Sequence, residues 1–556
     1  MTDPSPKRCV LLLSGGGFQG QGLFEVVRRV AGTRTIVADI HEEGVTRYLC
    51  ADYRRVPPLA QREAFIAALH SMIELDGVTA IFPSTAFELP LLAELRDALQ
   101  ARGVSVAVSS TDALRVLLDK RATARFLADH DIATQAPVDA RAHGFGTPLF
   151  GRPHGGWGGR DTCRLADTAS RDRLLSDGTL DDYIWTAFLP SFDELSVDFA
   201  IRPDGALSPL VLRKRLRTSG GFAVVSESVD PGSGEGAPAL ALAERAARAI
   251  AGIGGAGLFN LQVLRTPDGR SMVSDINPRF GTSSGHALGE GLNLAAFFLG
   301  EDARQGARHA VKTVRKLQDI TIARLPTQPT ALVFDLDDTL LDHKRWFAAK
   351  ALAAGDAVAR EWGDAELFRE TALGLVDEGE RRQFIDQLAQ RLGWTREQHA
   401  QYLDAFRAAR VEAPLFADVP DALAGLRAMG FKLALLTDNP PATQRQKLER
   451  APALGTFDAI VFSQDAGAEK PDARAFHAAA TALRLPPAQL CMIGDNLFRD
   501  GFGALRAGYG GAIVLRRPGA YIQPHDDLAR LSTFGDDPRL VHATDLVVAR
   551  EILRAR

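Results

Sequence analysis

The sequence has little of several features that would narrow its function. Its 556 residues include only four cysteines, and these are too scattered to form a disulfide framework or a metal-binding pattern. No stretch approaches the roughly 20 unbroken apolar residues of a transmembrane helix, and the first residues lack the charged and apolar regions of a signal peptide. We therefore expect no membrane partner and a cytoplasmic protein with buried thiols in a reducing compartment. The four cysteines are Cys9, Cys50, Cys163 and Cys491.

The chain also lacks a marked excess of either charge. Its 65 Lys and Arg residues against 69 Asp and Glu residues give a formal net charge of −4, so no basic excess indicates nucleic-acid binding. The sequence contains no internal repeat or low-complexity tract. The length exceeds what one domain needs, and we therefore expect several domains. The sequence leaves the oligomeric state open, with a homodimer as one option.

What the sequence does contain is an apolar strand that ends in two carboxylates. Residues 332–340 read Leu-Val-Phe-Asp-Leu-Asp-Asp-Thr-Leu, and in an extended segment Asp335 and Asp337 point to the same side. Such a pair suits a nucleophile beside an acid/base, or two ligands of a hard cation. The alternative is a solvated acidic turn that closes a buried strand.

Three further polar motifs follow, each at the end of an apolar run. Thr437 supplies a hydroxyl that can hold a phosphoryl oxygen, and Lys470 supplies an ammonium that can offset charge between phosphate and carboxylate. Asp495 and Asp500 form an acidic pair that could complete a site for Mg²⁺. Four such motifs in series favour a phosphate-handling enzyme.

From about Thr330 to the C-terminus, these motifs resemble the haloacid dehalogenase superfamily, including the continuation at residues 503–508. The resemblance implies that Asp335 is the nucleophile that forms an aspartyl-phosphate, as in the phosphatase version of the pattern. It implies that Asp337 is the general acid/base and that Thr437 and Lys470 orient the phosphate. It also implies a site for Mg²⁺, or alternatively Mn²⁺, held by Asp335, Asp337, Asp495 and Asp500.

An insertion at about residues 343–416 is rich in Ala, Leu, Glu and Arg and has helical spacing. It resembles the helical cap that such phosphatases close over the active site, and caps usually select the substrate. We expect its charged residues, such as Lys350, Arg381 and Arg382, to lie on solvated helix faces. The identity of the phosphate ester is not readable here.

The chain opens with a strand followed by a glycine-rich turn. Gly15, Gly17 and Gly20 form a G-x-G-x-x-G pattern, and Asp39 follows about twenty residues later, as in dinucleotide-binding domains. The pattern alone is weak. The competing interpretation is an α/β domain that binds no dinucleotide.

Polar residues further along favour polyphosphate binding. Arg152 ends a strand before a glycine-rich segment, where backbone N–H groups can approach phosphate oxygens. Two adjacent antiparallel strands would set Gln262 beside Asp275 and Asn277, three oxygen ligands suited to Mg²⁺, with Arg279 near the transferred group.

From about Arg115 to Gly300, these segments resemble the ATP-grasp superfamily, most nearly its carbamoyl-phosphate-synthase-like members. The resemblance implies that Glu194 contacts the ribose and that the alternating Arg213, Arg215 and Arg217 face the phosphoryl group or a carboxylate. Asp275 departs from the usual metal-binding Glu, and an acidic residue expected near residues 185–187 is missing. Implied nucleotide-binding residues are Lys120, Arg152, Gly158, Gly159, Glu194 and Arg215, and implied metal ligands are Gln262, Asp275 and Asn277.

We therefore expect a multidomain α/β protein. Its parts are a Rossmann-like domain at 1–112, an ATP-grasp α+β domain at 113–312, a linker at 313–329 and a haloacid dehalogenase-type domain at 330–556. The predicted function is an ATP-dependent carboxylate–amine (or thiol) ligase fused to a magnesium-dependent phosphatase. Its partners would be a small carboxylate, an amine and a phosphate ester. One alternative is a nucleotide-sensing module that regulates the phosphatase, and another is a Rossmann oxidoreductase fused to it.

Overall fold

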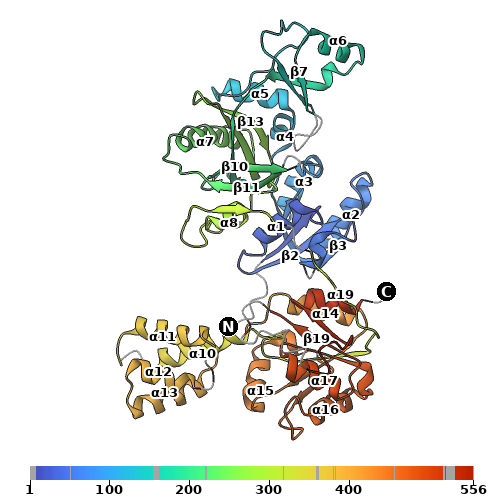
Figure 1. Cartoon of the computed structure of the whole chain (residues 1–556), viewed down its shortest axis with the longest axis vertical. Helices are drawn as coiled ribbons and strands as arrows, with labels where there is room; N and C mark the ends of the chain where they lie inside the picture. Colours follow the sequence, from blue (N-terminus) through green and yellow to red (C-terminus); the bar gives the residue numbers. More distant parts are fainter. Residues whose placement is uncertain are drawn as a thin grey trace. The chain divides into compact units, whose positions relative to one another are not determined.

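The computed structural model describes residues 8–50, 52–154, 162–219, 222–316, 319–358, 362–379, 381, 383–455, 457–517, 520 and 532–554. The chain forms two compact units, Met1–Gln318 and Asp319–Arg556 (Figure 1). Mixed helices and strands in several sheets confirm the predicted multidomain α/β fold. Among the described helices, none is both long and apolar enough to cross a membrane.

Unit 1 begins with a parallel five-stranded sheet in the order β3-β2-β1-β4-β5. Five of the six residues of β1 are buried, as expected of a central strand covered on both faces. The strands are β1 (Arg8–Leu13), β2 (Thr33–Asp39), β3 (Asp52–Arg55), β4 (Val78–Pro83) and β5 (Ser105–Val106). The helices are α1 (Phe18–Val27), η1 (Val45–Tyr48), α2 (Arg62–Asp76) and α3 (Leu89–Ala101).

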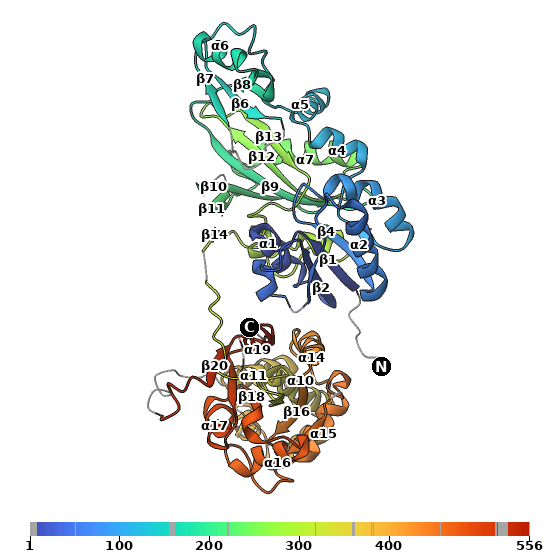
Figure 2. The same cartoon turned by 90° about the vertical axis from the view of Figure 1, so that its right-hand side faces the viewer.

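The second sheet of unit 1 is antiparallel, in the order β13-β12-β9-β10-β11-β14. Helix α7 packs its alanine-rich face against β9, β12 and β13 (Figure 2). The strands are β9 (Asp193–Ile201), β10 (Val211–Ser219), β11 (Phe222–Ser228), β12 (Gly257–Arg265), β13 (Ser271–Asn277) and β14 (Lys312–Val314). The helices are α4 (Thr111–Leu117), α5 (Lys120–Asp129), α7 (Gly236–Gly252), α8 (His286–Gly289) and α9 (Leu294–Phe298).

A small antiparallel sheet, β7-β6-β8, lies between these parts in sequence. It consists of β6 (Leu149–Pro153), β7 (Cys163–Leu165) and β8 (Tyr183–Ala187), with α6 (Thr168–Ser176) and η2 (Leu180–Asp182).

Two features of unit 1 bear on the predicted domain limits. One apolar cluster joins Val10 and Leu12 of the parallel sheet to Val211 and Leu258 of the antiparallel sheet, while two further clusters divide close to residue 112, so the limit at residue 112 stays a prediction. The predicted linker at 313–329 begins inside β14, whose backbone pairs with β11. Strand β14 is short and largely exposed, so its sequence carries little signal of burial.

Unit 2 contains a parallel six-stranded sheet in the order β17-β16-β15-β18-β19-β20. The strands are β15 (Ala331–Phe334), β16 (Lys432–Thr437), β17 (Ala459–Phe462), β18 (Leu490–Gly494), β19 (Gly511–Leu515) and β20 (Leu540–Ala543). The helices outside the insertion are α14 (Val419–Ala428), α15 (Pro441–Glu449), η3 (Pro452–Leu454), α16 (Ala473–Leu483), η4 (Pro487–Gln489), the π-helical turn η5 (Leu497–Phe502), α17 (Gly503–Arg506) and α19 (Leu546–Leu553).

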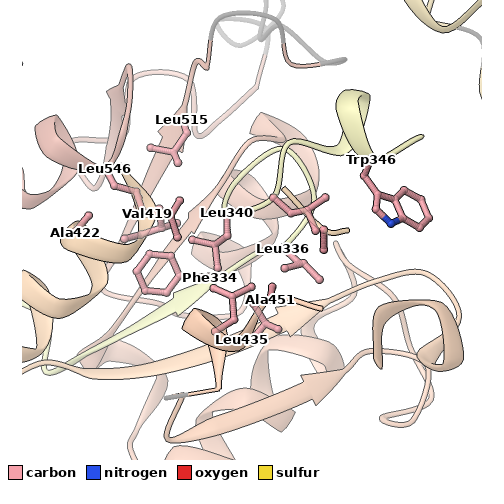
Figure 3. Close-up of a cluster of buried hydrophobic side chains, with 14 of the residues drawn as sticks. Phe334, Leu336, Leu340, Trp346, Val419, Ala422, Leu435, Ala451, Leu515 and Leu546 are labelled. Atoms are coloured by element: carbon pink, nitrogen blue, oxygen red, sulfur yellow. The ribbon is translucent and has the colours of Figure 1, made fainter. Parts of the chain in front are cut away.

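The predicted insertion forms four helices: α10 (His343–Val358), α11 (Ala365–Asp377), α12 (Phe384–Leu392) and α13 (Arg396–Ala408). The chain enters and leaves it at neighbouring points, because Leu341 pairs with Leu415 and the N–H of Phe416 donates to the carbonyl of Leu340. Phe334, Leu340 and Trp346 belong to one apolar cluster that continues into these helices (Figure 3). The start of α10 is thereby fixed close to the end of β15.

Candidate active sites

The candidate site of unit 2 lies where three neighbouring strands end. Asp335 follows β15, Thr437 is the last residue of β16, and Asp495 follows β18. Because these strands run parallel and side by side, their carboxyl ends meet at one edge of the sheet. Lys470 joins them from the loop before α16. The structure thus brings the four sequence motifs to one place.

Three carboxylates and one ammonium form the centre of this site. Oxygen atoms of Asp335, Asp495 and Asp500 lie within 4.8 Å of one another, and all three residues are buried. Lys470 Nζ lies 2.6 Å from Asp335 Oδ1 and 2.6 Å from Asp500 Oδ1. A Cβ atom on Gly494 would lie 2.4 Å from the Asp500 carboxyl group, so glycine leaves the room that this carboxylate occupies.

The charges of this cluster suit a bound divalent cation. Burial raises the pKa of Asp335 to about 7, with Lys470 opposing and Asp500 adding to the rise. Burial, then Asp500 and Asp335, raise the pKa of Asp495 well above its usual value. One lysine does not neutralise three close carboxylates, and hard oxygen ligands suit Mg²⁺. The residues therefore fit a divalent cation.

Asp337 lies outside this carboxylate cluster. Its two carboxylate oxygens lie 2.7 and 2.8 Å from Lys447 Nζ, and His343 Nδ1 lies 3.1 Å from Oδ1. Burial alone would raise the pKa of Asp337, but Lys447 and His343 outweigh it and hold that pKa well below its usual range. The expectation that the Asp337 side chain joins the metal ligands is therefore not met, because its charge is satisfied by these cations.

Sequence reasoning missed the residues that hold Asp337. Asn439 and Gln444 each donate to Asp337 Oδ2 at 3.1 Å, and Gln444 also donates to Thr437 Oγ1 at 2.6 Å. Gln444 and Lys447 are both buried and lie three residues apart on α15, hence on one helix face. A buried polar pair at this spacing looks the same in sequence as a solvated one.

The candidate site of unit 1 is a cavity of about 900 Å³. Residues of β12 and β13 line it, and Gln262 is the direct cross-strand neighbour of Asp275 as the sequence predicted. Asn277 donates to Asp275 Oδ2 at 3.2 Å, and Arg279 Nη2 lies 3.4 Å from Asn277 Oδ1. The predicted site residues that line the cavity are Arg152, Glu194, Arg213, Arg215, Gln262, Asp275, Asn277 and Arg279.

Three buried cations interact electrostatically with the carboxylate of Asp275. Burial lowers the pKa values of Lys120, Arg152 and Arg279, and Asp275 opposes each of these shifts. The charge of Arg152 also lowers the pKa of Lys120. A cavity wall with more positive than negative charge is suited to a polyphosphate and its bound cation.

The three alternating arginines of β10 do not act as one set. Arg213 is almost fully buried and donates to Asp198 at 2.7 Å and to Ser226 at 3.2 Å. Arg215 forms an ion pair with Glu194, the residue expected to contact ribose. The pairing of β10 with β11 shifts register on both sides of Arg217, which is exposed. Arg213 and Arg215 both line the cavity, whereas Arg217 is not among its lining residues, so the predicted set of three is reduced to two.

Two further predictions concern glycines. Gly158 and Gly159 lie outside the described residues, so their predicted contact with phosphate stays a prediction. In the opening turn, Gly16 N donates to Asp39 Oδ2 at 2.7 Å and His41 N donates to Oδ1 at 2.9 Å. Asp39 is buried and committed to these amides. This disfavours the dinucleotide interpretation, which needs that carboxylate for ribose.

Comparison with known proteins identifies unit 2. Residues 329–508 match the family described as haloacid dehalogenase-like hydrolase. The glyceraldehyde 3-phosphate phosphatase of Methanopyrus kandleri is 31% identical over 209 residues, which cover 35% of this chain and 88% of that protein. The chain belongs to the haloacid dehalogenase-like hydrolase family. The sequence resemblance is thereby confirmed for this part.

Two other likenesses carry less weight. A phosphoserine phosphatase of Thermus thermophilus is 34% identical over 128 residues, covering 23% of this chain and only 51% of that protein. Among solved structures, an N5-carboxyaminoimidazole ribonucleotide synthetase of Thermus thermophilus is 19% identical and covers 58% of this chain and 84% of that one, with a TM-score of 0.42. At this identity and TM-score the likeness says nothing about activity.

Proposed function

We propose that unit 2 is a magnesium-dependent phosphatase that acts on a small phosphate monoester through an aspartyl-phosphate. The observation that carries this proposal is the buried cluster of Asp335, Asp495 and Asp500 around Lys470 Nζ. Mg²⁺ bound by these carboxylates would supply neutralisation of charge on the transferring phosphoryl group. Lys470 orients the Asp335 carboxylate that attacks phosphorus.

Asp335 Oδ attacks phosphorus in line, the P–O bond to the alcohol breaks, and the alkoxide takes a proton from Asp337. Asp337 then accepts a proton from water, whose oxygen attacks the aspartyl-phosphate and releases inorganic phosphate. The resting ion pair with Lys447 keeps Asp337 as a carboxylate, the form needed for the second step. Protonation for the first step requires that Lys447 move or pass on its own proton.

The test is Asp335→Asn, because a neutral amide does not attack phosphorus. We expect release of phosphate from an aryl phosphate to fall at least about 10³-fold, since a covalent step is removed. Asp404→Asn is the matched control, because Asp404 is 81% exposed on α13, and it should retain the wild-type rate. A rate for Asp335→Asn within tenfold of wild type contradicts the nucleophile assignment.

We further propose that unit 1 is an ATP-dependent carboxylate–amine (or thiol) ligase with an ATP-grasp domain, which forms an acylphosphate. The supporting observation is the cavity lined by Arg152, Arg279 and Asp275 beside Gln262. Lys120 does not line this cavity, but its charge interacts with Asp275. Gln262, Asp275 and Asn277 would hold Mg²⁺ against the phosphates. The cations would neutralise the phosphate oxygens as the γ-phosphoryl group moves to the carboxylate.

The regulatory alternative, in which unit 1 binds nucleotide without turnover, is favoured by the shorter side chain of Asp275 and its bond to Asn277. A screen of carboxylates paired with amines or thiols separates the two. Acceptor-dependent ADP release supports the ligase. Absence of any such release, together with an effect of ATP on the phosphatase rate, supports regulation.

A further inference from the structure

Helix α10 of the cap carries a lysine that the sequence suggested would be solvated. Lys350 is instead 6% exposed. Its Nζ lies 5.0 Å from the centre of the Trp346 ring and 5.1 Å from that of Phe406. Aromatic faces stabilise an ammonium, although less than a carboxylate does. The correction arises because α10 turns this face toward the core of unit 2.

Among the residues that the structure describes, the charged groups that act on Lys350 are themselves positive. Among the described carboxylates, none forms an ion pair with Lys350, and the charged groups that act on it are the cations Arg410 and Lys447. Burial and these two neighbours lower the pKa of Lys350. A buried cation without a counter-ion is costly, and an anionic group of a ligand that reached Lys350 would offset that cost.

Trp346 links this lysine to the acid/base of the phosphatase site. Lys447 Nζ lies 4.2 Å from the centre of the same indole ring and 2.7 Å from Asp337 Oδ1. His343, on the same face of α10 as Trp346 and Lys350, lies 3.1 Å from that oxygen. The cationic region therefore extends from Asp337, where the leaving group departs, along one face of the cap helix.

We propose that Lys350 binds a second anionic group of the phosphate ester, a carboxylate or a second phosphate on its alcohol part. This inference rests on the proposed phosphatase function and names the substrate class of that site. Lys447 is committed to Asp337, so Lys350 is the specificity-determining residue. Arg410, whose guanidinium donates to the last carbonyl groups of α13, adds to the positive field.

The test compares esters that differ only in the second group. One pair is 3-phosphoglycerate and glycerol 3-phosphate, and the other is fructose 1,6-bisphosphate and fructose 1-phosphate. For wild type we expect kcat/KM to favour the more anionic member of at least one pair. Lys350→Met should reduce that ratio about 10- to 100-fold, since a hydrogen bond to a charged group is lost. The two pairs distinguish a carboxylate from a second phosphate.

Two variants serve as controls. Arg345→Met removes the same charge from the same helix, but Arg345 is 81% exposed, so the ratio should stay as in wild type. Lys350→Arg retains the charge and should keep most of the preference. A purely structural lysine would give equal ratios in Lys350→Met and wild type, and this result overturns the inference while the phosphatase function stands.

A binding measurement separates the two proposals. Calorimetry with Asp335→Asn measures the affinity for each member of the pairs without turnover. If the protein binds the more anionic ligand more tightly, and Lys350→Met abolishes that preference, the Lys350 site is supported. This holds even if wild type hydrolyses none of the esters, a result that would contradict the phosphatase function alone. Equal affinities within both pairs overturn the role of Lys350.

Discussion

At the scale of single residues, the structure separates charges that carry chemistry from charges that hold the fold together. Lys470 lies between two carboxylates of the phosphatase site, whereas Arg213 is buried with Asp198 and Ser226 inside a sheet. The two differ in what surrounds them. The negative charge of the three carboxylates exceeds the positive charge of Lys470, which favours binding of a cation. Arg213 and Asp198, by contrast, neutralise each other.

Glu88 gives a prediction about pH at this scale. Glu88 is 1% exposed and directly follows residues 85–87, which line the cavity of unit 1. Burial raises its pKa, with hydrogen bonds from Ser14 and Thr85 opposing the rise. A raised pKa in the folded state means that the folded protein binds the proton more tightly. This stabilisation is present below the unfolded value and is lost as pH rises through the folded one.

Glu88→Gln should remove that dependence, because an amide does not ionise. The free energy of unfolding of wild-type unit 1 should fall relative to the variant as pH rises above about 4.5, the unshifted value. Urea titrations from pH 4 to pH 8 measure this. Glu63→Gln, on the exposed start of α2, is the control. Parallel curves for wild type and Glu88→Gln would show that Glu88 does not titrate as its burial indicates.

At the scale of elements, strand ends and one tight turn place the reacting groups. Strands β15, β16 and β18 deliver Asp335, Thr437 and Asp495, and the π-helical turn η5 returns Asp500 to the same point. Asp500 Oδ2 accepts from Asn496 N at 3.0 Å. The geometry depends on how closely η5 packs against the end of β18.

Gly494→Ala tests this packing. The added Cβ would lie 2.4 Å from the Asp500 carboxyl group and 2.6 Å from its Cβ, so the whole side chain must shift. We expect the concentration of Mg²⁺ that gives half-maximal phosphatase activity to rise about 10- to 100-fold, as for other disturbed metal surroundings.

Gly374→Ala on α11 is the matched control, because its added Cβ meets nothing within 4 Å. Helix propensity makes that change neutral or stabilising. An unchanged magnesium dependence in Gly494→Ala would mean that Asp500 does not help to hold the ion.

The sequence predicted these elements well where the signal is local. An apolar run that ends in Asp335 or Asp495 predicts both the strand and the position of its polar end. Residues such as Lys350 and Lys447 were not predictable, because a lysine in a helical segment has the same local sequence whether it meets solvent or a buried partner. Strand β14 was missed for a related reason, since its three residues gain their structure only from pairing with β11.

At the scale of the whole molecule, the two units hold separate sites with separate sets of polar residues. Asp275 and its cations belong to unit 1, and Asp335 with Lys470 belongs to unit 2. A single chain with two such sites could pass the product of one reaction to the other, for example by ligation followed by removal of phosphate.

The most direct test of two independent activities is a crossed assay on the full chain. Phosphate release from an ester and acceptor-dependent ADP release are measured for wild type, Asp335→Asn and Asp275→Asn, with Asp268→Asn in the β12–β13 turn as control. Asp335→Asn should lose only phosphate release, and Asp275→Asn should lose only ADP release while still binding ATP more weakly. Loss of both activities in either variant would contradict the account. So would retention of both activities in both variants.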